Sequence, residues 1–235
     1  MQKMRLRKKI RLRRQEGNMI KRFNEINGIN ITKIDGQGRF AYAVTEFEDF
    51  YDVSLREDEN GYRGAVIMFY DPENGGVYTP FEKKRNVTYG KPIFSNGFFF
   101  FLKGDFNKRE ITLYRYLPGN SPETVTVLNA DETDLYNLSL MGEGVNVISQ
   151  GDSFNCYYPQ RFSFPLQGSE TAVLIRDNTV LTEAWIEEGW DSEKDRATDG
   201  YRFYNKVLVR DFDGKTLSEE IGSLYLADDG TVWIS

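Results

Sequence analysis

Short apolar segments separated by turns rich in Gly, Asp or Asn recur along the chain. Five segments have the form of a β-hairpin, with an apolar strand, a tight turn and a second apolar strand: residues 29–44, 91–102, 136–149, 171–185 and 223–235. Such turns between short apolar runs are a strong local signal for hairpins. The pattern therefore predicts a chain built almost entirely from antiparallel strands.

Further strand pairs lie between these hairpins, so the unit that repeats has four strands. The additional pairs cover residues 64–81, 109–128, 154–166 and 205–222, and the third of them is the shortest. Four antiparallel strands per repeat are typical of the blades of a β-propeller. We therefore expect an all-β, β-propeller-like fold of about four to five four-stranded blades. A two-sheet β-sandwich is the alternative.

The fifth hairpin, residues 223–235, has no second strand pair after it in the sequence. Between the basic residues 1–18 and the first hairpin, residues 19–28 are enough for about one strand. Three interpretations remain open: a short fifth blade, a hairpin that caps four blades, or a fragment of a longer propeller.

Four consecutive Phe residues, 98–101, place large rings on both faces of one strand. A strand of this kind needs cover on both faces. A middle strand of a propeller blade, which lies between two neighbouring blades, meets that need. We assign this run to core packing.

Residues 226–233, LADDGTVW, partly match the Asp-box turn of sialidases and related propellers. Asp228, Gly230 and Trp233 occupy the expected positions, whereas Leu226 and Val232 replace a Ser and a Thr. The chain thus resembles β-propellers in general, over about residues 28–235, without the signature of any one family. The Asp-box is a structural turn, so the resemblance concerns the fold and implies no catalytic residue.

The composition excludes several kinds of catalytic site. The chain contains no His, which removes Ser-His-Asp triads, Cys-His nucleophiles and metal sites that need imidazole. The single Cys156 cannot form an internal disulfide, and its aromatic neighbours indicate a buried position. We expect no cofactor and no metal site. No apolar run reaches the length of about 18 residues that a membrane span needs.

The net charge of −6 is unevenly distributed. Residues 1–22 contain ten basic residues and one acidic residue, which leaves 20 basic and 35 acidic residues, or −15, for residues 23–235. An acidic body repels a phosphate backbone, so we expect no nucleic-acid partner.

Two motifs that resemble nucleotide-binding loops are better explained as turns. GQGRFA, residues 36–41, has the glycine spacing of a dinucleotide site, but an aromatic, strand-like segment follows it where that site needs a helix. DGKT, residues 213–216, lacks the earlier glycine of a phosphate loop, because position 209 is Val209. Both are expected in hairpin turns.

Two long segments combine acidic and aromatic residues. Residues 46–64 contain seven acidic residues against two Arg, and residues 184–206 contain six acidic residues among Trp and Tyr. Both should connect the second and third strands of their blades and so lie on one rim. The candidate residues for binding a ligand or partner are Phe50, Tyr51, Glu57, Asp58, Glu59, Trp190, Asp191 and Tyr201.

Aromatic residues in a charged rim suit the binding of a partner. We therefore expect a non-enzymatic binding or scaffold protein whose partner is another protein or a carbohydrate. The alternative is a glycoside hydrolase or related sugar-active enzyme, which needs a pair of carboxyl groups. The sequence does not indicate which carboxylates would pair.

The basic residues 1–18 form a separate extension. They contain no apolar core of the length that a signal peptide needs. Gln15, Glu16 and Gly17 can be encoded by CAG GAG GGN, which contains the ribosome-binding sequence AGGAGG shortly before the codon for Met19. We expect translation to start at Met19, residues 1–18 to be disordered or an artefact of the start site, and residues 19–235 to form one domain of a bacterial, cytoplasmic protein.

Overall fold

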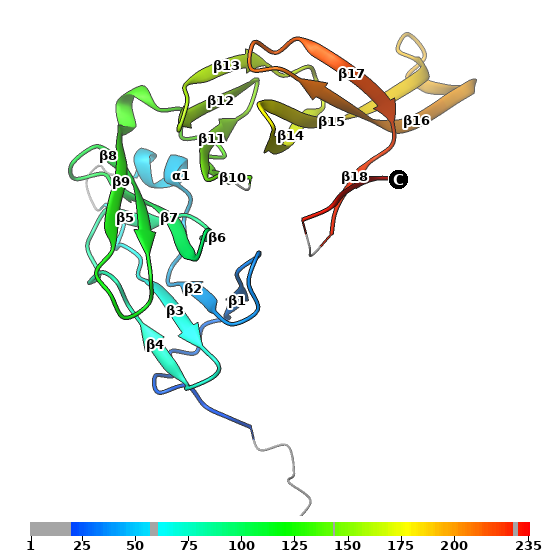
Figure 1. The fold of residues 1–235 in the computed structure, drawn as a ribbon. Helices are drawn as coiled ribbons and strands as arrows, with labels where there is room; N and C mark the ends of the chain where they lie inside the picture. The colour runs from blue at the N-terminus through cyan, green and yellow to red at the C-terminus, as the bar shows by residue number, and fades with distance from the viewer. Residues whose placement is uncertain (1–19, 57–60, 143, 228–229) are drawn as a thin grey trace, which may run out of the picture.

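The computed structural model describes residues 20–56, 61–142, 144–227 and 230–235, and its strands form successive antiparallel sheets (Figure 1). Each sheet is made from consecutive strands of the chain. The first sheet contains β1 (Thr32–Lys33), β2 (Ala41–Val44), β3 (Ile67–Asp71) and β4 (Gly76–Tyr78). The short helix α1 (Phe50–Leu55) lies in the connection between β2 and β3, where the sequence predicted only a loop.

The second sheet has four strand positions, although five strands contribute to it. It contains β5 (Val87–Tyr89), β6 (Ile93–Ser95), β7 (Phe98–Asp105), β8 (Glu110–Tyr116) and β9 (Glu123–Asn129). β5 pairs with residues 103–105 of β7 and β6 with residues 98–100, so these two short strands share one edge of β7. A 3-10 turn, Ala130–Glu132, follows β9.

The third and fourth sheets repeat the same order, and the last sheet is a single hairpin. The third sheet contains β10 (Ser139–Met141), β11 (Asn146–Gln150), β12 (Ser153–Tyr158) and β13 (Phe162–Pro165). The fourth contains β14 (Glu170–Arg176), β15 (Thr179–Asp191), β16 (Arg196–Arg210) and β17 (Thr216–Ile221). β18 (Leu224–Leu226) pairs with β19 (Val232–Ile234).

The sheets follow one another along an arc, with the first strands towards its inner side and the last strands outside (Figure 1). Hairpins on the inner side contact each other across neighbouring sheets. A Cβ atom added to Gly142, in the β10–β11 turn, would lie 3.0 Å from the carbonyl oxygen of Ile175 in β14. The Arg176 guanidinium in turn donates a hydrogen bond to the carbonyl oxygen of Gly230, in the turn before β19.

The strands and sheets confirm the predicted all-β class and the repeated blade-like sheets.

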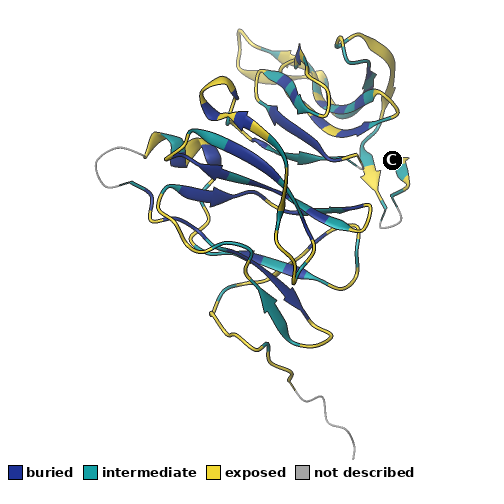
Figure 2. Ribbon diagram, turned by 60° about the vertical axis from the view of Figure 1, so that its left-hand side comes forward, coloured by how far each residue is buried: buried dark blue, intermediate teal, exposed yellow. Residues whose placement is uncertain are grey.

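The strands of the first and second sheets are largely buried (Figure 2), and aromatic side chains fill the core between them. The ring of Phe69 in β3 lies 5.3 Å from that of Phe99 and 5.8 Å from that of Phe101, both in β7. The other two Phe residues of the run, Phe98 and Phe100, are half-buried, and the Arg115 guanidinium covers the ring of Phe98 at 4.6 Å. The prediction of cover on both faces is therefore correct, although one face is covered less completely.

The segment before β1 packs on the first sheet. The backbone N–H of Asn24 donates to the carbonyl oxygen of Gly75, and the rings of Phe23 and Tyr70 form a T-shaped pair with their centroids 5.1 Å apart. Residues 1–19, which include the predicted start at Met19, lie outside the described part of the chain. Among the described residues, β18 and β19 pair only with each other.

Candidate functional site

The second acidic segment, residues 184–206, forms a two-stranded ribbon where the sequence predicted a loop. β14 pairs with β15 as far as Ala184, and β17 pairs with β16 as far as Lys206. Beyond these positions β15 and β16 pair only with each other, and residues 185–205 extend outward from the fourth sheet (Figure 1). We call these residues the arm.

One face of the arm presents a row of four aromatic side chains, which we call the ladder: Trp185, Phe203, Tyr201 and Trp190. Successive ring centroids along this row are 6.2, 6.4 and 5.9 Å apart. Trp185 is 46% exposed, Trp190 44% and Phe203 64%, so solvent reaches most of the row. Large aromatic side chains that contact each other yet remain this exposed form an apolar patch of the kind often found at interaction sites.

A carboxylate lies beside the ladder. The Tyr201 hydroxyl donates a hydrogen bond of 2.6 Å to Oε1 of Glu187, and this bond to a charged acceptor raises the pKa of Tyr201. Glu187 forms no ion pair with another residue of the described chain. The ladder face therefore combines aromatic rings with one unneutralised negative charge.

The opposite face of the arm has its own carboxylate, which is neutralised. Glu188 accepts hydrogen bonds from the Arg202 guanidinium and from the Tyr204 hydroxyl, the latter at 2.9 Å. The bond from Arg202 lowers the pKa of Glu188. The guanidinium also lies 5.6 Å from the centre of the Tyr204 ring, within the range of a cation–π contact.

A β-bulge near the tip depends on Gly189. This residue has φ = +78°, and a Cβ atom there would lie 2.7 Å from the carbonyl carbon of Gly200 on the facing strand. The pairing register shifts at this point, between Glu188 and Trp190. Oδ1 of Asp191 accepts from two backbone N–H groups of the following turn, at 3.2 Å each, so Asp191 helps to close the tip.

The first acidic segment, residues 46–64, places its predicted residues differently. Phe50 is only 3% exposed, because its ring packs over Gly104, where a Cβ atom would lie 2.8 Å from it. Phe50 therefore supports the fold and offers no surface to a ligand. Tyr51 is 43% exposed and its ring lies 6.0 Å from that of Tyr136. Glu57, Asp58 and Glu59 lie outside the described residues.

Both acidic segments connect the second and third strands of their sheets, as the sequence predicted. Figure 1 shows α1 beside the second sheet and the arm at the far end of the fourth. The structure thus brings together Trp190, Asp191 and Tyr201 in the arm and keeps Tyr51 apart from them. A ligand shared by all the predicted residues stays a prediction.

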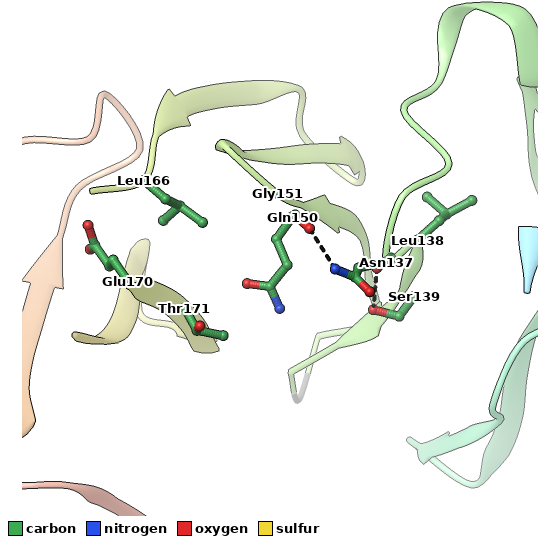
Figure 3. Close-up of a pocket in the computed structure, with 8 residues that line it drawn as sticks. All are labelled: Asn137, Leu138, Ser139, Gln150, Gly151, Leu166, Glu170 and Thr171. Atoms are coloured by element: carbon green, nitrogen blue, oxygen red, sulfur yellow. Dashed lines mark hydrogen bonds between the residues drawn. The ribbon is translucent and has the colours of Figure 1, made fainter. Parts of the chain in front are cut away.

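A cavity of about 500 Å³ lies between the third and fourth sheets (Figure 3). Ser139 and Gln150 come from the third sheet, Asn137 lies just before its first strand, and Glu170 and Thr171 begin β14. Two of its amide side chains bond within the protein: Asn137 Nδ2 donates to the carbonyl oxygen of Gln150 at 3.0 Å, and Gln150 Oε1 accepts from the backbone N–H of Ala172 at 3.0 Å. No sequence pattern indicates this cavity, because it lies at the junction of two repeats.

A smaller cavity, of about 370 Å³, adjoins α1. Glu48, Arg56 and Tyr62 contribute to its lining, and Arg56 donates a 2.6 Å hydrogen bond to Glu48. This pairing leaves the Glu48 carboxylate partly neutralised.

Among the described residues, every carboxyl group with a shifted pKa has a pKa below its ordinary value. These groups are Asp71, Asp131, Glu170 and Glu188. A general acid needs a raised pKa instead.

Cys156 is buried, as expected, and burial raises the pKa of its thiol to about 11, so it is a poor nucleophile.

The described residues contain no cluster of three or more side chains suited to holding a metal ion. No described helix is both long and apolar enough to cross a membrane.

The fold and the arm together define the class: an all-β protein of successive blade-like sheets with an exposed aromatic ribbon. Comparisons with known proteins add no closer identification, because no family model, no curated protein and no solved structure matches the chain.

Proposed function

We propose that the chain is a non-enzymatic binding or scaffold protein of β-propeller-like architecture, and that the arm contacts its partner. The observation that supports this proposal is the exposed ladder on a ribbon that extends beyond its sheet. Trp and Tyr are enriched among the residues that dominate binding energy at protein interfaces. A ribbon with solvent on both sides gains little for folding from its aromatic side chains, which fits a role in binding.

A carboxylate-based glycoside hydrolase is the alternative class. That chemistry needs a protonated carboxylic acid beside a second carboxylate. Lowered pKa values, as at Glu188, keep a carboxyl group ionised and so do not supply the acid. The observations on the described residues therefore favour binding over hydrolysis.

Removing the arm tests the proposal. Residues 187–203 are replaced by Asn-Gly, a favoured two-residue hairpin turn, which joins the paired residues Ile186 and Tyr204. We expect the full chain to retain partners from an extract of its source cells, and the shortened chain to lose them. An unchanged unfolding temperature shows that the sheets remain intact. Retention of the same partners by both chains would contradict the proposal.

A further inference from the structure

The back of the arm shows how this ribbon binds a guanidinium group. Arg202 lies over the ring of Tyr204 while its nitrogen atoms bond to Glu188, whose carboxylate also accepts from the Tyr204 hydroxyl. A tyrosine hydrogen-bonded to a carboxylate thus forms a site for a cation, in which the aromatic ring and the charge act together.

The ladder face repeats this arrangement one residue away. Tyr201 bonds to Glu187 as Tyr204 bonds to Glu188, and the rings of Trp190 and Phe203 lie 5.9 and 6.4 Å from that of Tyr201. Here no basic side chain of the described chain pairs with the carboxylate. The face therefore offers the same chemistry to a cation from outside the chain, with more aromatic surface around it.

The spacing of the ladder fits an extended chain. Alternate side chains of a β-strand lie about 6.6 Å apart on one face. The ladder rings are 5.9–6.4 Å apart. Trp185 and Trp190 belong to β15, and Phe203 and Tyr201 to β16, so an extended segment that lies along the middle of this face can bring alternate side chains against successive rings. The acidic body, with −15 on residues 23–235, adds long-range attraction for a basic segment.

We infer that the ladder face docks an extended segment of a partner protein that carries Arg or Lys at alternate positions. This inference rests on the proposed function of the arm as the partner-binding element. Trp185, Tyr201, Phe203 and Trp190 provide the rings, and Glu187 provides the charge. The alternative occupants, a neutral oligosaccharide and a second copy of this chain, are outcomes of the test.

The chain's tryptophans allow a direct test. Of its three Trp residues, Trp185 and Trp190 belong to the ladder and Trp233 lies in β19, so indole N–H signals in NMR report on the arm with an internal control. The probe is a blocked heptapeptide in which Gly and Arg alternate. A matched peptide has citrulline in place of Arg, which keeps the shape and removes the charge.

We expect the Arg peptide to shift the signals of Trp185 and Trp190 and to leave that of Trp233 unchanged. The citrulline peptide should bind at least about fivefold more weakly. Raising salt from about 50 mM to about 500 mM should weaken the Arg complex, because the contact is partly electrostatic and exposed.

Two neighbouring carboxylates provide a matched pair of variants. Glu187→Gln changes the ladder face, and Glu188→Gln makes the same change in charge on the opposite face. We expect Glu187→Gln to weaken binding of the Arg peptide about two- to fivefold and Glu188→Gln to leave it unchanged. Equal losses would show that only net charge matters and would overturn the inference.

Other results also overturn it. The first is equal binding of the Arg and citrulline peptides, and the second is that only a neutral cellohexaose probe shifts the Trp185 and Trp190 signals. The third is that these signals change with protein concentration before any probe is added. The fourth is that they move when salt is raised before any probe is added. The last would indicate that the basic residues 1–22 occupy the ladder. If removal of the arm abolishes partner capture but no basic peptide binds, the inference fails and the proposed function stands. If neither effect is seen, both fail.

Discussion

Glu170 and Arg210 form an ion pair inside the fourth sheet, where their side chains are 1% and 5% exposed. Two hydrogen bonds of 2.6 Å join the guanidinium to the carboxylate, and Thr182 also donates to it. Burial raises the pKa of Glu170, but the bonds from Arg210 and Thr182 outweigh burial and hold the pKa below its ordinary value of 4.5. Glu170 therefore stabilises the fold as an anion.

Removing this carboxylate should be costly at neutral pH. We expect Glu170→Gln to lower the free energy of unfolding by about 3 kcal/mol at pH 7, because Arg210 is left buried without its partner charge. Because the pKa of Glu170 is lower in the folded protein than in the unfolded chain, its ionised form stabilises the fold above pH 4.5. This stability is lost as the pH falls through the pKa of Glu170 in the folded protein. The difference between the two proteins should therefore shrink below pH 4.5 in urea unfolding experiments.

Glu219→Gln is the control for this change. Glu219 pairs with Lys206 at 3.1 Å on the exposed surface, so its loss should cost less than about 1 kcal/mol. A difference between wild type and Glu170→Gln that is the same at pH 7 and at acidic pH would contradict the assigned role of the ion pair.

The sequence predicts the environment of some single residues and not of others. Cys156 was expected to be buried because aromatic residues flank it, and it is. Phe50 was expected to be at a surface, since acidic residues surround it in sequence. Its burial depends on Gly90 and Gly104, which are distant in sequence and leave room for its ring. No pattern near Phe50 carries that information.

At the scale of the elements, the turn residues of the sequence predict the hairpins but do not predict the arm. Every hairpin expected from an apolar–turn–apolar pattern is present. The arm lacks an apolar pattern, and it is paired through contacts such as Tyr201 with Glu187 and Arg202 with Glu188. Such cross-strand pairs become visible only when the register is known. The sequence therefore indicated the arm's residues as a site but predicted a loop there.

Two glycines in connections between strands allow the cost of backbone strain to be distinguished from the cost of a steric clash. Gly64, before β3, has φ = +86°, and a Cβ atom there would lie 1.8 Å from the Lys84 carbonyl oxygen. Gly97, in the β6–β7 turn, has φ = +82° and open space around it. We expect Gly97→Ala to cost about 1 kcal/mol and Gly64→Ala about 3 kcal/mol or more, measured by chemical denaturation. Equal costs would contradict the close approach of residues 64 and 84.

Across the whole molecule, burial is uneven. Phe99 and Phe101 in β7 and Leu113 in β8 are almost inaccessible to solvent, whereas no residue of β18 or β19 is buried. The four-strand repeat was predictable because each unit depends on its own turns. Closure of the arc into a ring could not be predicted, because it depends on contacts between units that are distant in sequence.

Hydrogen exchange should reveal this gradient. We expect the backbone amides of β18 and β19 to exchange first and those of β7 and β8 last, because local opening of the final hairpin exposes little apolar surface. Exchange followed by mass spectrometry measures both segments in one experiment. Equal protection of β18 and β7 would show that the final hairpin has contacts that the described residues do not provide.

The length of β15 and β16 gives the arm a mechanical property. They have 13 and 15 residues, and each runs without a break from the interior of the fourth sheet into the arm, where their pairing is regular as far as Glu188. No loop interrupts the ribbon where it leaves the sheet. A force applied to the arm would therefore pass along continuous, hydrogen-bonded strands into the fourth sheet.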